Sequence, residues 1–135
     1  MIQAIKNYFL QYTNFPPSAL LNVDALGNEV DNFSIDFTPC KRILETYLNG
    51  TTERQQTFVL AGRFVYNNDN TTILEFFNDI EQWIENNNNA GNLPVLSSGQ
   101  TAEKIEVMSN GYLISQDGTE ARYQIQLRLL YREEE

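Results

Sequence analysis

The chain has 135 residues, the size of one domain, so we expect a single domain over residues 1–135. Because 41% of the residues are hydrophobic, we expect a real core. Its apolar runs are too short for a transmembrane helix, so we expect no membrane span. Its net charge of −9 argues against a nucleic-acid binder, because gripping phosphates requires clustered Lys and Arg. It has no histidine and one cysteine, which removes the commonest general base, most zinc sites and any internal disulfide.

The N-terminal half is predicted to contain one helix followed by strands. Apolar residues recur at spacings of three and four over residues 1–13, which predicts an amphipathic helix without the long apolar core of a signal peptide. Alternating side chains predict strands at residues 19–25 and 33–38, and more weakly at 42–48. Pro39 interrupts the hydrogen-bonding ladder, so we expect a sheet edge or a bend there.

A long central strand is predicted over residues 55–66, after a tight hairpin turn at Asn49-Gly50. Both of its faces are fairly apolar, so we expect it to be covered on both sides. The next segment, Asn67-Asn68-Asp69-Asn70, is predicted to be a polar loop.

The second predicted helix starts at a capping box, in which Thr72 caps the helix and Glu75 reaches back to it. Apolar side chains then follow at helical spacing through Ile84. The four asparagines at residues 86–89 are interpreted as a solvated, fraying helix end, and Gly91 marks its stop.

The C-terminal part is predicted to be β-structure. A strand is expected at residues 103–108, and Asn110-Gly111 is interpreted as a bulge rather than a turn. Asp117-Gly118 predicts a hairpin into a strand at residues 119–132, whose odd positions are apolar and whose even positions are almost all polar. The predicted fold class is α+β, with a mainly antiparallel sheet of about five to six strands packed with an N-terminal and a central helix.

Residues with catalytic potential are scarce. No phosphate-binding loop or calcium loop is present. Cys40 lies beside Lys41 and Arg42, cations that lower a thiol pKa, but a catalytic thiol needs a base, so we interpret it as structural. We therefore expect no catalytic residue, no cofactor and no metal site, and we favour an interaction or structural protein over an enzyme.

Several segments resemble one protein family. They are residues 1–13, 20–24, 33–40, 55–66 with the helix through Trp83-Ile84-Glu85, 92–94, 104–107, 110–113, 121–126 and 128–131. Together they cover most of the chain. The sequence is similar to the minor capsid or tail-terminator (tail completion) proteins of long-tailed bacteriophages that infect Gram-positive bacteria.

This resemblance implies a structural virion protein at the head-proximal end of the tail, made in the host cytoplasm. Its partners would be further copies of itself in a homohexameric ring, the tail tube protein and the head-side connector protein. It implies no enzyme activity and no cofactor. Genomic DNA would pass through the ring without stable binding, and the negative charge fits a lumen that is acidic or neutral.

A head-to-tail ring needs two different contact patches on each copy. The residues expected at such interfaces are Pro39, Asn49, Gly50, Arg54, Asn67, Asn70, Arg122 and Arg128. Arg122, Arg128 and Arg132 alternate on one strand face, which leaves two interpretations open, a positive stripe that lines the channel or a protein-contact face. The alternative functions are another connector ring protein, a stopper or adaptor, and an unrelated binding module with a cavity under the second helix.

Overall fold

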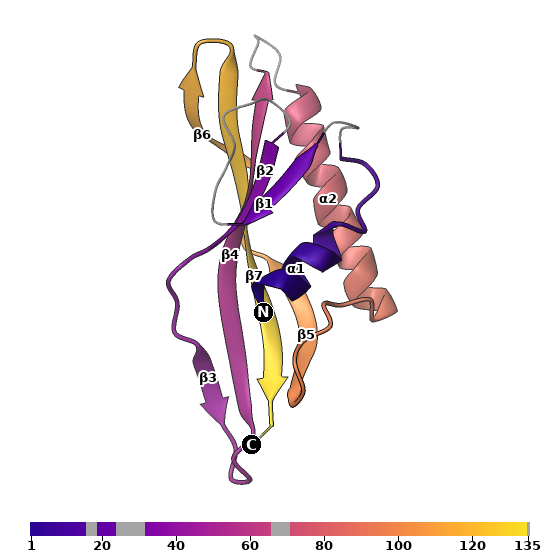
Figure 1. Cartoon of the computed structure of the whole chain (residues 1–135), viewed down its shortest axis with the longest axis vertical. Helices are drawn as coiled ribbons and strands as arrows, with labels where there is room; N and C mark the ends of the chain where they lie inside the picture. The colour runs from indigo at the N-terminus through magenta and orange to yellow at the C-terminus, as the bar shows by residue number, and fades with distance from the viewer. Residues whose placement is uncertain (16–18, 24–31, 66–70, 135) are drawn as a thin grey trace.

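Two 14-residue antiparallel strands, β4 (Thr52–Val65) and β7 (Glu120–Glu133), pair along their whole length and form the axis of the molecule (Figure 1). The register runs from Thr52 opposite Glu133 to Val65 opposite Glu120. Every odd position of β7 from Ala121 to Tyr131 is buried and every even position is at least partly exposed. The predicted alternation of residues 119–132 is therefore confirmed.

The computed structural model describes residues 1–15, 19–23, 32–65 and 71–134. Its α+β class, with two helices and a mostly antiparallel sheet, confirms the prediction, although the sheet has seven strands rather than five to six. The remaining elements are α1 (Ile2–Phe9), β1 (Leu20–Val23), β2 (Asn32–Phe37), β3 (Ile43–Thr46), α2 (Thr71–Ala90), β5 (Gln100–Val107) and β6 (Tyr112–Asp117).

The sheet differs between the two halves of this axis. One half has the strand order β1-β2-β4-β7-β6, and the other has β3-β4-β7-β5. Among the strands of the described residues, only β1 and β2 pair in parallel. Both helices lie on one side of the sheet (Figure 1). The expected coverage of β4 on both faces holds in the middle of the strand, where Val59 and Ala61, on the face away from the helices, are buried like the core residue Leu60.

The core lies between the helices and the apolar side of the sheet. Five buried residues there were expected from the periodicity of the strands and of the second helix: Phe64, Ile80, Ile125, Leu127 and Leu129. A chain of aromatic contacts joins α1, β2 and α2, for example Tyr8 with Trp83 and Phe33 with Phe76. Aromatic rings bury large areas and prefer such tilted and edge-on packing.

The helices differ from their predicted limits. The α1 helix ends at Phe9 rather than near residue 13, and the turns that follow still bury Tyr12. Because α2 begins at Thr71, Thr72 lies within the helix and the predicted capping box is wrong. The asparagine tract is helical rather than frayed, while Gly91, with φ 75°, ends the helix as predicted.

Both predicted hairpins are confirmed, with Gly50 at φ 89° and Gly118 at φ 60°. The bulge at Asn110-Gly111 is also confirmed, because β5 and β6 pair in succession with the same edge of β7. The chain advances five residues from Val107 to Tyr112 while β7 advances only three, from Leu127 to Gln124. The weak strand prediction at 42–48 corresponds to β3, all of whose residues are exposed.

Candidate functional site

A β-hairpin arm, residues 43–54, extends beyond the helices at the end of the molecule where the C-terminus lies (Figure 1). Asn49 and Gly50 form its turn: the Asn49 side chain accepts from the Thr51 N–H at 3.0 Å, and Gly50 donates to the Tyr47 carbonyl at 3.0 Å. These two predicted interface residues therefore shape the tip of the arm.

The arm carries apolar side chains that have no core to enter. Those that are exposed are Ile43, Leu44, Tyr47 and Leu48. Leu48, in the turn, is fully exposed at 110% of its reference area. Exposed apolar groups gathered on an edge strand are typical of a surface that another molecule covers.

The base of the arm is held by polar contacts. Arg54 forms an ion pair with Glu133 at 2.8 Å and donates to the Thr52 hydroxyl at 2.9 Å. Arg42, just before β3, donates to the Tyr131 hydroxyl at 3.2 Å. Arg54, predicted as an interface residue, thus ties the arm to β7.

Pro39 lies at the rim of a hollow of about 250 Å³ midway along the β4–β7 axis. Pro39, which follows β2, and Met108, which follows β5, flank it, and β4 and β7 supply its floor. Its remaining lining residues are Thr38, Thr57, Phe58, Val59, Gln126 and Leu127. All of its lining residues are uncharged, and Phe58, Val59 and Leu127 are buried.

The sheet face opposite the helices, here called the open face, carries the arginines of β7. Arg122 pairs with Asp36 at 3.3 Å, and Arg128 pairs with Glu106 at 2.8 Å and also donates to Gln55 at 3.1 Å. Arg132 contacts Glu53 at 2.9 Å. Each of these arginines thus faces a carboxylate, so the described residues form no unbroken positive stripe on the open face. Such partly exposed pairs contribute about 0–1 kcal/mol each.

Arg132 also lies within 3.8 Å of Glu103, so two carboxyl groups share one guanidinium. A hydrogen bond with Glu53, together with burial, raises the pKa of Glu103. The same hydrogen bond, together with Arg132, lowers the pKa of Glu53. Because like charges this close disfavour double ionisation, Glu103 is the carboxyl of the pair that holds a proton more readily than an isolated glutamate.

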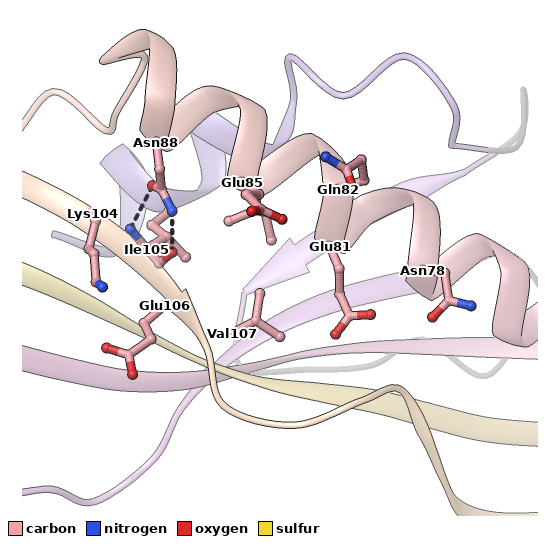
Figure 2. A pocket seen from close by; sticks show the side chains of 10 residues that line it. Asn78, Glu81, Gln82, Glu85, Asn88, Lys104, Ile105, Glu106 and Val107 are labelled. Carbon is pink, nitrogen blue, oxygen red and sulfur yellow. Dashed lines mark hydrogen bonds between the residues drawn. The ribbon is translucent and has the colours of Figure 1, made fainter.

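A cleft of about 440 Å³ separates α2 from the edge strand β5 (Figure 2). Glu81 and Glu85 line it from the helix, and Lys104 and Glu106 line it from the strand. Burial raises the pKa of the Glu81 carboxyl. At one end, Asn88 donates to the Ile105 carbonyl at 2.8 Å and accepts from the Ile105 N–H at 3.0 Å. The cleft lies under the second helix, where the alternative function of a binding module places its cavity.

Within residues 1–15, 19–23, 32–65 and 71–134, no group of three or more His, Cys, Asp or Glu side chains is placed to hold a metal ion. Neither helix, over the same ranges, combines the length and apolarity needed to cross a bilayer. Cys40 is half-buried, and its thiol lies 3.9 Å from the Gln55 carbonyl.

The predicted interface residues divide into separate regions. Asn49, Gly50 and Arg54 come together in the arm, Pro39 borders the hollow, and Arg122 and Arg128 lie on the open face. Asn67 and Asn70 lie outside the described residues. Sequence reasoning missed Leu48 and Asn88. A leucine directly before Asn49-Gly50 is a signal for an exposed apolar turn, whereas the contact of Asn88 with β5 leaves no local signal.

The chain matches no protein-family model and no curated protein.

Proposed function

We propose that the chain is a structural virion protein without catalytic activity, a tail terminator of a long-tailed bacteriophage. In this proposal six copies form a ring that caps the tail tube, stops its polymerisation and joins it to the head-side connector protein. The ring would lie at the head-proximal end of the tail, and genomic DNA would pass through it without stable binding.

The observation that carries the proposal is the arm, with Leu48 fully exposed at its tip. An apolar hairpin that leaves its own domain favours a protein whose role is to contact other subunits. The ion pairs of the open face add to this, because arginines that already face carboxylates are poor counter-charges for phosphates. The family resemblance supplies the particular assembly.

Electron microscopy of the protein mixed with cognate tail tubes tests the proposal. We expect six-fold density at one end of each tube and tubes that no longer lengthen. Leu48→Asp should reduce tube capping, whereas Val95→Asp, at a site that is 88% exposed and outside the arm, should not. A reconstruction that places the protein in a different symmetry, or no attachment to tubes, would contradict the proposal. Density nearer the capsid would favour the alternative of a stopper or adaptor ring.

A second candidate function is a small binding module that uses the cleft between α2 and β5. Two of its lining residues, Glu81 and Glu85, are helix carboxylates, which suits a cationic ligand. Lys104 also lines the cleft, and Glu106 is already paired with Arg128. Thermal-shift measurements with spermidine and with Mg²⁺ test this function, and Glu81→Gln is the matched variant. A ligand-dependent increase in Tm that Glu81→Gln abolishes would favour the binding module. Stoichiometric transition metal in the purified protein would overturn the expectation that it holds none.

A further inference from the structure

We propose that Leu48 at the tip of the arm inserts into the Pro39–Met108 hollow of a second copy of this chain. The inference rests on the proposed function in that it names the contact between neighbouring copies of the ring. The arm is the inserting patch and the hollow is the receiving patch. Each copy carries one of each, as a head-to-tail assembly requires.

The first argument is the fit between an apolar side chain and an uncharged recess to which Pro39, Val59 and Met108 contribute apolar surface. Leu48 is fully exposed at 110% of its reference area, and the hollow of about 250 Å³ is floored in part by buried Val59. Interface hot spots lie in well-packed, desolvated pockets, and Tyr is among the residue types enriched in them. The size of the hollow exceeds that of one leucine side chain, which leaves room for Tyr47 beside it.

The second argument is that the arm is too far from its own hollow. Thr52, near the tip, and Thr57, in the hollow, are five residues apart along the same strand, which is ~17 Å at ~3.3 Å per residue. Leu48 lies still further out, beyond the turn at Asn49-Gly50. Because β4 is rigidly paired with β7 on its other side, the arm cannot fold back. Only another copy can bring a Leu48 to this hollow.

The third argument is electrostatic. Copies that each carry a net charge of −9 repel one another, so a contact between them is most favourable where neither surface is charged. The turn, residues 47–52, contains no charged side chain, and neither does the lining of the hollow. The cleft under α2, with three carboxylates, lacks this property and is a poor receiver for a copy of so acidic a chain.

Disulfide trapping tests the contact in the full chain. The single native cysteine is first replaced by Cys40→Ala, and then one variant carries Leu48→Cys and a second carries Met108→Cys. Leu48 and Met108 are both exposed, so neither change removes a core side chain. The two proteins are mixed at the highest soluble concentration and are oxidised. One of them carries an isotope label, so that a mixed disulfide differs in mass from either homodimer. A control mixture replaces the Leu48→Cys variant with Val95→Cys, which is 88% exposed on a different surface.

We expect mixed disulfides in the Leu48–Met108 mixture at a yield on the order of 100-fold above the control, because a docked pair has an effective concentration in the millimolar range, about 100-fold above that of the freely diffusing protein. A chain that carries both cysteines should give a ladder of covalent oligomers that ends in a closed species. No enrichment over the Val95→Cys control overturns the contact. Disulfide-linked homodimers of the Leu48→Cys variant, formed without mixed disulfides, would also overturn the contact, because they would indicate that two arms meet.

A second measurement fills the hollow instead of altering the arm. Met108→Trp should block insertion and should reduce assembly, followed by sedimentation velocity, as strongly as Leu48→Asp, while both variants keep the wild-type Tm. The proposed function and this contact fail differently. Six-fold caps on tail tubes without the Leu48–Met108 disulfide would retain the function and overturn the contact. The disulfide in solution without tube capping would retain the contact and overturn the function.

Discussion

The side-chain amide of Asn88 in α2 makes both hydrogen bonds of a neighbouring strand to one residue of β5, Ile105, at 2.8 and 3.0 Å (Figure 2). The amide of an asparagine has the same donor and acceptor as a peptide group. At this point the helix thus replaces the missing strand at the sheet edge and closes part of an edge that is otherwise available for pairing.

Replacing Asn88 by alanine should lower the free energy of unfolding by about 1–2 kcal/mol, because it leaves the N–H and carbonyl of Ile105 without their partner. Urea denaturation measures this. Asn89→Ala is the matched control, since Asn89 is an exposed neighbour in the same tract. Equal stability of the two variants would show that water replaces the amide.

Gly111 should not tolerate alanine. A Cβ added there would lie 2.4 Å from Cγ of Phe77, a core residue of α2. We expect a loss of about 1–3 kcal/mol in unfolding free energy, because the ring must move within a packed core. Gly118→Asn serves as the control, because a Cβ at Gly118 meets no atom within 4 Å and asparagine tolerates its positive φ of 60°. If both variants unfold alike, the ring of Phe77 has room to shift.

Leu127 tests the register of the axis. It is fully buried on the helix side of β7, opposite Phe58. Leu127→Asp would bury an unpaired charge and should lower the unfolding free energy by about 4 kcal/mol or more. Thermal melting compares it with Val95→Asp, whose side chain remains in solvent. A Leu127→Asp protein with the wild-type Tm is incompatible with the register described here.

Local sequence patterns predict much of the fold. The period of two in residues 119–132 predicted which side chains of β7 are buried, and the Gly50 and Gly118 turns were predicted from residue pairs alone. These features depend on neighbours in the sequence. The start of α2 was misplaced because a capping box matches Thr72 as well as any other threonine, while the helix already includes Thr71.

The remaining features depend on contacts between distant residues. No local rule links Asn88 to Ile105, or Arg122 to Asp36 across 86 positions. The alternating arginines predicted a stripe, but only strand order shows that carboxylates from three other strands face them. In the same way, the hollow beside Pro39 exists because Met108 comes to the other side of the axis.

The contact between Tyr12 and Asp79 should make stability depend on acidity. The Tyr12 hydroxyl, followed by the Asn14 amide, donates to Asp79 and lowers the pKa of its carboxyl below the ordinary 3.8. A lowered folded-state pKa contributes stability that is present above pH 3.8 and is lost as the pH falls through the folded-state value.

Tyr12→Phe removes the stronger donor and should therefore lower Tm at neutral pH, with a difference from wild type that shrinks below pH 3.8. Melting curves over a pH series measure this difference. The control is Asp79→Asn, which has no carboxyl to titrate at this position. Its stability should fall less steeply with acid than that of the wild type. A Tyr12→Phe difference that stays constant across the acid range would show that loss of the hydroxyl destabilises the fold whether or not the Asp79 carboxyl is ionised.

The ion pairs of the open face lead to the expectation that the isolated protein does not bind duplex DNA. Arg122, Arg128 and Arg132 face Asp36, Glu106 and Glu53, so a phosphate must displace a carboxylate at each site before any counterion is released. A gel-shift assay at low salt should show no shift for the wild type. Glu106→Gln removes the partner of Arg128 and should permit weak, salt-sensitive binding, whereas Arg128→Glu should not.

The same arginine separates the two interpretations of the open face, a channel lining and a protein-contact face. If the open face contacts protein, Arg128→Glu should also impair ring formation or tube attachment. The double variant Arg128→Glu, Glu106→Arg should then restore part of it by re-forming the pair. Tight duplex binding by the wild type would contradict the proposed acidic or neutral lumen, and normal assembly of Arg128→Glu with altered DNA passage would place Arg128 in the channel.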